Sequence, residues 1–202
     1  VKNQILPNNV KNKELIDAFF NVKKEYFIPK DQYDLTYSDA EIKVSQDRSM
    51  MKTFVVAKML DKCNFNKDDK ILFIGCLTGY SLAVVSKMVN YVFGIENDKK
   101  ITEIASKNIN DLNILNCSIF FKKELSQGLV RNAPYDKIFI EGSVKTIPPS
   151  LVKQLKTNGE IFVILKSEDY IGQFVRGLKI ESNLSIEKFF NTSLKDSVEI
   201  II

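Results

Sequence analysis

Residues 71–80 read Ile-Leu-Phe-Ile-Gly-Cys-Leu-Thr-Gly-Tyr. The four apolar residues in a row predict a buried strand, and the glycines Gly75 and Gly79 predict a tight turn into a following helix. The free N–H groups at the start of that helix would face a ligand bound at the turn. The turn does not match Gly-x-Gly-x-x-Gly and lacks the lysine of a phosphate-binding loop, so by itself it also fits a purely structural turn.

Short apolar runs continue along the chain, and stretches with helical spacing separate them. The predicted strands are 71–74, 91–95, 118–121, 137–140 and 161–165. The predicted helices are 80–88, 99–112 and 149–156, with Asn158-Gly159 as the C-cap of the last one. This alternation predicts an α/β fold, a parallel sheet with helices on both faces.

The last part of the chain has no room for crossover helices. Residues 172–180 and 184–193 are therefore predicted as two further strands joined antiparallel. The apolar segment Val198–Ile202 fits either a strand that completes the sheet or one that pairs with a neighbouring molecule.

The first sixty residues differ from the rest in the spacing of their apolar residues. Apolar residues recur with helical spacing between Asn12 and Phe27, and Pro29 ends that pattern. The expected buried face consists of Leu15, Phe19, Val22 and Tyr26, with Phe20 alongside. Residues 30–50 are expected to form an ordered loop, and 54–60 a second amphipathic helix. We predict a single domain, with a helical cap and substrate loop in residues 1–66 and a ligand-binding core in residues 67–202.

Composition limits the possible chemistry. The chain has 202 residues, of which 45% are hydrophobic and 27% charged, as expected for one soluble globular domain. It contains no histidine, which excludes Ser/His and Cys/His nucleophile pairs and most zinc sites, so we expect no metal. Its three cysteines, Cys63, Cys76 and Cys117, are too few and too widely spaced for a disulfide framework and are expected to be core thiols.

Charge and hydropathy argue against nucleic-acid and membrane partners. The net charge of +4 includes only three arginines, Arg48, Arg131 and Arg176, whereas phosphate and guanine recognition rely on arginine. We therefore expect no nucleic-acid partner. No apolar run approaches the roughly 18–20 residues that cross a bilayer, and Val1–Pro7 is too short and polar for a signal peptide. A cytoplasmic protein without a membrane partner is expected.

Acidic residues follow several predicted strands. Glu96 ends the second strand about twenty residues after the glycine turn, where a carboxylate can accept both ribose hydroxyls of a nucleoside. Glu124 follows the third strand, where it could accept an adenine amino group or simply begin a helix. The fourth strand runs into the loop 141–149 at the same edge. A solvated surface glutamate is the alternative for Glu96.

Several segments are similar to one known family. Residues 18–29 contain Val-Lys-Lys-Glu-Tyr-Phe-Ile-Pro, and residues 147–159 read Ile-Pro-Pro-Ser-Leu-Val-Lys-Gln-Leu-Lys-Thr-Asn-Gly. They resemble Val-Pro-Arg-Glu-x-Phe-Val-Pro and Ile-Pro-x-x-Leu-x-x-Gln-Leu-x-x-Gly-Gly of the protein-L-isoaspartate O-methyltransferase family, in particular its divergent alphaproteobacterial type. The resemblance extends over 35–39, 71–83, 94–96 and 133–140.

The resemblance implies a class I methyltransferase fold and an enzyme that uses S-adenosyl-L-methionine to methylate carboxylates of damaged proteins. The implied partner is a protein or peptide that contains isoaspartyl residues. Such a reaction needs no histidine, because a carboxylate nucleophile is already ionised at pH 7. The implied cofactor-binding residues are Gly75, Cys76, Thr78, Gly79, Tyr80, Glu96, Asn97 and Glu124. The implied substrate-facing residues are Ser49, Met51, Ser143 and Val144, with Ser49 as the candidate catalytic hydroxyl.

The chain also departs from the family pattern at functional positions. Met51 stands where the family has a substrate-binding serine, and Phe73 stands where an acidic residue helps to hold the methionine end of the cofactor. Leu77 replaces the middle glycine of the turn, and Lys123 and Leu125 replace the glycines of Gly-Asp-Gly. Two alternatives therefore remain open: a methyltransferase-fold binding protein that has lost its reaction, and a methyltransferase with a different substrate.

Overall fold

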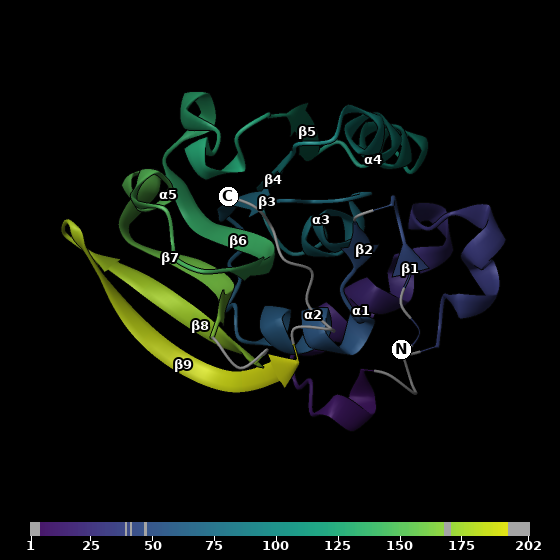
Figure 1. Cartoon of the computed structure of the whole chain (residues 1–202), viewed down its shortest axis with the longest axis horizontal. Coiled ribbons are helices and arrows are strands. Elements are labelled where there is room, and N and C mark those ends of the chain that lie inside the picture. The colour runs from purple at the N-terminus through teal and green to yellow at the C-terminus, as the bar shows by residue number, and fades with distance from the viewer. Residues whose placement is uncertain (1–4, 39, 41, 47, 168–170, 194–202) are drawn as a thin grey trace.

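A seven-stranded sheet forms the centre of the molecule (Figure 1). The computed structural model describes residues 5–38, 40, 42–46, 48–167 and 171–193. The strands lie in the order β5-β4-β3-β6-β7-β8-β9. Their bounds are β3 Lys70–Ile74, β4 Tyr91–Glu96, β5 Cys117–Phe121, β6 Tyr135–Val144, β7 Leu155–Lys166, β8 Ile171–Ile180 and β9 Asn183–Ser193. Strands β3 to β7 pair in parallel, which confirms the predicted sheet.

Helices cover the sheet. The core elements are α3 Tyr80–Val85, α4 Lys99–Asp111 and α5 Pro149–Lys153, with the short 3-10 turns η4 Leu125–Gln127 and η5 Val130–Asn132. The two faces belong to two hydrophobic clusters, because neighbouring residues of a strand point to opposite sides. Ile71 and Phe73 of β3 belong to the cluster shared with α1, α2 and α3, whereas Leu72 and Ile74 belong to the cluster shared with α5 and η4.

The N-terminal segment packs onto the first of these faces. Its elements are η1 Leu6–Asn8, α1 Lys13–Asn21, η2 Lys24–Phe27, η3 Lys30–Leu35, β1 Ile42–Lys43, β2 Ser49–Met50 and α2 Thr53–Asp61. The side chain of Asn12 caps α1 by accepting from the Leu15 N–H at 3.1 Å. The Asp61 carboxylate at the end of α2 accepts from the backbone N–H groups of Lys11 and Asn12, both at 2.9 Å. These bonds join the two predicted helices of the cap.

The first helix is shorter than predicted. Helix α1 ends at Asn21, because Val22 adopts an extended conformation, and residues 24–27 form a separate 3-10 turn. Because of this break, Tyr26 does not continue the helical face of α1. Phe20 is 48% exposed and Tyr26 is 55% exposed, so the prediction that Tyr26 belongs to a buried helical face was wrong.

The helix before β7 also ends earlier than predicted. Helix α5 stops at Lys153, and Gln154 forms its C-cap. The Gln154 side chain accepts from the Leu129 N–H at 2.9 Å and donates to the Gln127 carbonyl at 2.9 Å, so it fixes the chain direction there. The predicted C-cap Asn158-Gly159 instead lies within β7, in an irregular stretch between the pairs Tyr135–Leu155 and Lys137–Glu160.

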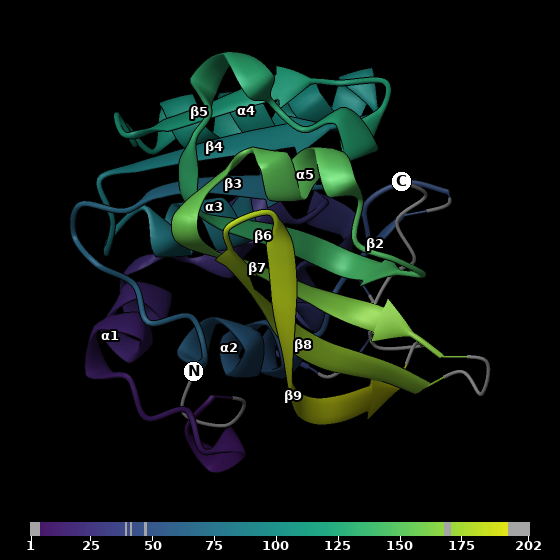
Figure 2. The same cartoon turned by 90° about the vertical axis from the view of Figure 1, so that its left-hand side faces the viewer.

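Strands β8 and β9 form the predicted antiparallel pair and lie at the opposite end of the sheet from β5 (Figure 2). Phe174 of β8 stacks on Phe189 of β9 at 5.6 Å between ring centroids. Lys58 of α2 lies over the ring of Phe190, and Lys62, the C-cap of α2, lies over that of Phe189. The hairpin therefore packs against the N-terminal segment. The predicted strand 198–202 lies outside the described residues. Within the described ranges, no helix has both the length and the apolar character needed to cross a membrane.

Candidate functional site

The strand order reverses between β3 and β6, since β4 and β5 lie on one side of β3 while β6 and β7 lie on the other. Ligands of open parallel sheets bind beyond the carboxyl ends of the strands at such a reversal. We call the carboxyl ends of β3, β4 and β6 the carboxyl edge. The sequence features that predicted a ligand site, the glycine turn and Glu96, both lie there.

The turn after β3 is held by backbone hydrogen bonds. The N–H groups of Gly75 and Cys76 both donate to the Ile95 carbonyl, at 2.9 and 3.2 Å. Gly75 and Gly79 have φ values of 71° and 90°, a left-handed region that glycine enters without steric cost. Leu77 also has a positive φ, 47°, and is only 2% exposed. A left-handed leucine costs roughly 1–2 kcal/mol, and strain of this kind clusters at functional sites.

Glu96 is a buried anion at this edge. Its exposure is 0%, so the alternative of a solvated surface glutamate is excluded. The Leu77 N–H donates to Glu96 Oε2 at 2.9 Å, and the Asn97 N–H donates to Oε1 at 2.9 Å. Arg48 completes the set, with Nη1 3.0 Å from Oε1 and Nη2 3.4 Å from Oε2. The carboxylate is thus oriented by both the glycine turn and a guanidinium.

Arg48 was not predicted as a site residue. It immediately precedes β2, which pairs antiparallel with β1. Its Nη1 atom also donates to the Asn97 side chain at 3.1 Å. The predicted cofactor residues Glu96 and Asn97 are therefore brought together with the hairpin that contains Ser49, although 48 residues separate Arg48 from Glu96.

Glu141 is a second buried carboxylate at the carboxyl edge. It is 4% exposed, and its Oε1 atom accepts from the Ser81 hydroxyl on α3 at 2.7 Å. Burial raises the pKa of Glu141 to about 7, and the nearby charge of Glu96 adds to this rise. The hydrogen bond from Ser81 opposes the rise, as do the charges of Arg48 and Lys24.

Several buried polar atoms at this edge lack a hydrogen-bond partner among the described residues. They are Arg48 Nε, Thr78 Oγ1, Glu141 Oε2 and Ser143 Oγ. Buried polar atoms in folded proteins are nearly always paired, so each exception needs an explanation. A polar ligand at the carboxyl edge would supply the missing partners, and both donors and acceptors are available for it.

The predicted cofactor residues Cys76 and Tyr80 have side chains in the core. Burial raises the pKa of the Cys76 thiol well above its usual value, which keeps it protonated. Burial likewise raises the pKa of Tyr80, whose ring packs against Phe27 at 5.5 Å and Phe19 at 6.1 Å. Glu124 is exposed, and its carboxylate forms no side-chain cap with η4. Among the described residues, none of these three side chains forms a hydrogen bond with Glu96.

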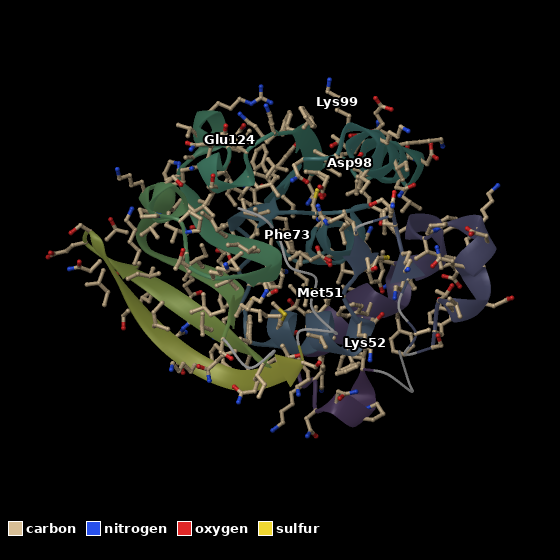
Figure 3. All side chains as sticks on the ribbon, viewed as in Figure 1. Met51, Lys52, Phe73, Asp98, Lys99 and Glu124 are labelled. Carbon is tan, nitrogen blue, oxygen red and sulfur yellow. The ribbon has the colours of Figure 1, made fainter. Side chains whose placement is uncertain are left out.

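Most departures from the family pattern are buried: Met51, Phe73, Leu77 and Leu125 lie in the interior, whereas Lys123 is exposed. Phe73 is fully buried, and its ring lies 5.0 Å from that of Phe139 on β6. Met51 is 3% exposed, and both residues lie near the centre of the view in Figure 3, whereas Glu124 lies nearer its edge. Of the other predicted substrate residues, Ser49, Ser143 and Val144 are buried as well.

Lys24 lies next to the predicted substrate loop and was also not predicted. It is 4% exposed, and its ammonium donates to Thr53 Oγ1 at 2.8 Å, two residues after Met51. Burial lowers the pKa of Lys24 to about 8, and the charge of Glu141 opposes that change. No cluster of three or more potential metal ligands occurs in the described part of the chain.

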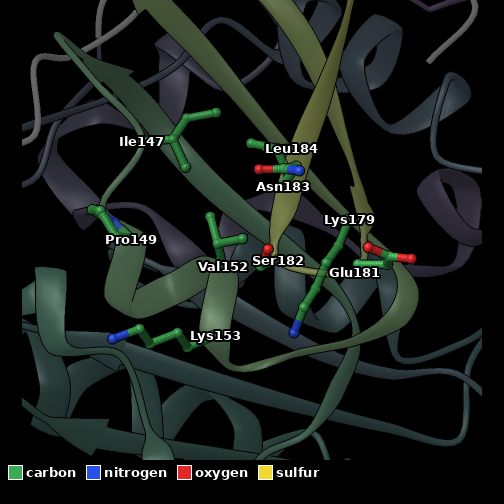
Figure 4. Close-up of a pocket in the computed structure, with 9 residues that line it drawn as sticks. All are labelled: Ile147, Pro149, Val152, Lys153, Lys179, Glu181, Ser182, Asn183 and Leu184. Carbon is green, nitrogen blue, oxygen red and sulfur yellow. The ribbon is translucent and has the colours of Figure 1, made fainter.

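A groove lies between α5, the loop before it and the turn of the β8–β9 hairpin (Figure 4). Its lining includes Val152 and Lys153 of α5 and the hairpin residues 181–184. Ile147, in the loop that follows the carboxyl end of β6, and Pro149, at the start of α5, also line it. The groove therefore adjoins the loop that leaves the carboxyl end of β6.

Comparison with known proteins agrees with this geometry. The model of the family described as Protein-L-isoaspartate(D-aspartate) O-methyltransferase matches residues 1–191. A protein-L-isoaspartate O-methyltransferase of Ignicoccus hospitalis is 26% identical over 202 residues, which is 98% of this chain and 95% of that protein. One of Protochlamydia amoebophila is 28% identical over 163 residues, 81% of this chain and 77% of that protein.

Solved structures show the same fold. A protein-L-isoaspartate O-methyltransferase superimposes with a TM-score of 0.81 at 24% identity, over 90% of this chain and 60% of that one. A putative protein-L-isoaspartate O-methyltransferase from Plasmodium falciparum, in complex with S-adenosyl-L-homocysteine, superimposes with a TM-score of 0.74 at 20% identity. The match covers 93% of this chain and 92% of that one. Both confirm the predicted Rossmann-like fold with helices on the two faces of a mostly parallel sheet.

Proposed function

Because the chain belongs to the protein-L-isoaspartate(D-aspartate) O-methyltransferase family, we propose that it methylates carboxylates of proteins or peptides that contain isoaspartyl residues. The proposed methyl donor is S-adenosyl-L-methionine, whose demethylated product is bound by the Plasmodium relative. The observation that carries the proposal is the fully buried Glu96 carboxylate, oriented by the N–H of the glycine turn at the sheet reversal.

The residues at the carboxyl edge fit this cofactor. Glu96 would accept the ribose hydroxyls, and the unpaired Thr78 and Ser143 hydroxyls would meet its other polar atoms. When bound, the cofactor would supply a methyl group on a sulfonium for transfer to a carboxylate oxygen of the acceptor, with the C–O bond formed as the C–S bond breaks and a neutral thioether left. The protein has to align the two groups and exclude water.

The hairpin β1–β2 and the residues after it are proposed to face the methyl acceptor. The contact of Arg48 with Glu96 supports this, because it holds the segment that contains Ser49 and Met51 against the carboxyl edge. We keep Ser49 as the candidate catalytic hydroxyl. Glu124 remains a candidate for the adenine amino group, since it follows β5 at the same end of the sheet.

A methyl-transfer assay with radiolabelled S-adenosylmethionine and an isoaspartyl peptide tests the proposal. The same peptide with a normal aspartyl linkage is the control. We expect label in the isoaspartyl peptide only. A folded protein that labels neither peptide would contradict the repair function.

A binding protein without the reaction is the alternative that specific residues favour. Phe73 and Met51 are packed into the interior, so neither offers a hydrogen bond to cofactor or acceptor. Calorimetry with S-adenosylhomocysteine separates the two functions. Micromolar binding supports the enzyme, whereas no heat at millimolar ligand supports the degenerate protein. Micromolar binding without label in the isoaspartyl peptide would support a methyltransferase with a different substrate.

We also propose that residues 1–66 and 67–202 act as one domain, because both contribute to the cluster that contains Phe73. A reducing, cytoplasmic location is proposed as well. It is supported by Cys63, Cys76 and Cys117, all of which are buried and free.

A further inference from the structure

Only one of the two carboxylate oxygens of Glu141 has a hydrogen-bond partner among the described residues. Ser81 donates to Oε1, whereas Oε2 is buried and has no hydrogen-bond partner in the described ranges. A carboxylate oxygen left unpaired away from water is costly, more so than an unpaired neutral group. A ligand that donates a hydrogen bond to this oxygen would offset that cost.

The backbone places this carboxylate at the carboxyl edge. Ile140 pairs with Ile74, so Glu141 follows directly at the level of the glycine turn. There β6 leaves regular register with β7: Phe139 pairs with Phe162, and the next pair is Ser143 with Ile164. A bulge of this kind redirects side chains and is common beside active sites.

The cations near Glu141 are engaged elsewhere. Arg48 directs its Nη1 and Nη2 atoms at Glu96, and Lys24 donates to Thr53. Among the described residues, Arg48 Nε has no hydrogen-bond partner, and neither cation forms a hydrogen bond with Glu141 Oε2. Phe73, on the neighbouring strand β3, offers only a ring that packs on Phe139. The carboxyl edge therefore presents one buried carboxylate oxygen, Glu141 Oε2, to a cationic donor from outside the protein.

We propose that Glu141 binds the ammonium group of the cofactor's methionyl end. This inference rests on the proposed function. Of the two positive groups of the cofactor, the sulfonium has no N–H or O–H, whereas the ammonium has three donors that suit an unpaired carboxylate oxygen. Glu96 on β4 and Glu141 on β6 flank β3, so a ligand held by both passes over the glycine turn.

The test compares two ligands on two matched variants. S-adenosylhomocysteine carries the ammonium, and 5′-methylthioadenosine has the adenosine and thioether but no amino acid part. Glu141→Gln removes the charge and keeps the shape and a partner for Ser81. Glu103→Gln makes the same change at an exposed residue of α4 and serves as the control. Thermal unfolding verifies that both variants fold.

Titration calorimetry should show that Glu141→Gln weakens S-adenosylhomocysteine binding about ten- to hundredfold and leaves 5′-methylthioadenosine binding unchanged. Glu103→Gln should match the wild type for both ligands. Equal losses for the two ligands would overturn the inference, because they would indicate a structural role. Equal S-adenosylhomocysteine binding by the wild type and Glu141→Gln would overturn it as well.

A pH series adds an independent readout. The ligand requires the ionised carboxylate, and burial holds the pKa of Glu141 near 7. Wild-type affinity for S-adenosylhomocysteine should therefore rise up to about tenfold between pH 6 and pH 8, and Glu141→Gln should lose this rise. A variant that keeps the full rise would contradict the inference. A wild type that binds neither ligand would refute the proposed function too, whereas binding without methyl transfer would refute the proposed function alone.

Discussion

Arg48 and a bound ribose would compete for the same carboxylate, and this makes Arg48→Met an informative variant. The guanidinium occupies both oxygens of Glu96, at 3.0 and 3.4 Å. The Leu77 and Asn97 N–H groups occupy them as well. Ribose hydroxyls therefore have to displace Arg48 before they can bind. Methionine keeps much of the arginine's apolar stem and removes its donors.

The expected effects have opposite signs. Removal of one partner of a buried ion pair costs about 3–5 kcal/mol, and a hydrogen bond to a charged group is worth about 1.5–3 kcal/mol. Because backbone donors stay on Glu96, we expect a loss within the hydrogen-bond range, about 2–3 kcal/mol in the free energy of unfolding. For a chain of this size the melting temperature falls by about 5–10 °C. Affinity for S-adenosylhomocysteine should rise about tenfold, which corresponds to about 1.4 kcal/mol of competition removed.

Thermal unfolding and titration calorimetry on the same samples measure both effects. Arg131→Met, at an exposed arginine of η5, is the matched control and should leave the affinity unchanged. Weaker S-adenosylhomocysteine binding by Arg48→Met would refute the reasoning. It would mean that the guanidinium holds Glu96 in position for the ribose instead of competing with it.

Three further changes test the site and its support. Glu96→Gln should weaken S-adenosylhomocysteine binding at least about tenfold in calorimetry, and unchanged affinity would remove Glu96 from the site. Gly94→Ala should destabilise the fold by about 1–3 kcal/mol in urea unfolding. The reason is that a Cβ at this position would lie 2.6 Å from Leu82 Cδ2 and 3.0 Å from Cys76 Sγ. A variant as stable as the wild type would contradict this close contact. Burial lowers the pKa of Lys24 from 10.5 to about 8, so the native state binds fewer protons than the unfolded state between these values. Wild-type stability relative to Lys24→Met should therefore rise from pH 8 to pH 10.5, and an unchanged difference would count against a buried Lys24.

Much of the fold could be predicted because its evidence is local. Each parallel strand is a short apolar run with a turn at its end, and the turn at Gly75 and Gly79 needs only backbone freedom. The boundaries of α1 and α5 were less predictable. Helix α1 stops where Val22 becomes extended, and α5 stops where Gln154 bonds to Leu129, a contact across 25 residues.

The site divides in the same way. The position of Glu96 at the carboxyl edge was predictable, since it ends the second parallel strand whatever surrounds it. Its burial and its pairing with Arg48 were not, because only the folded chain brings together residues 48 positions apart. Glu141 likewise follows an apolar run visible in the sequence, but its unpaired oxygen results from the bulge in β6 and the position of α3. Local patterns specify strands, turns and the edge where charges gather, whereas desolvation and the choice of partner depend on long-range packing.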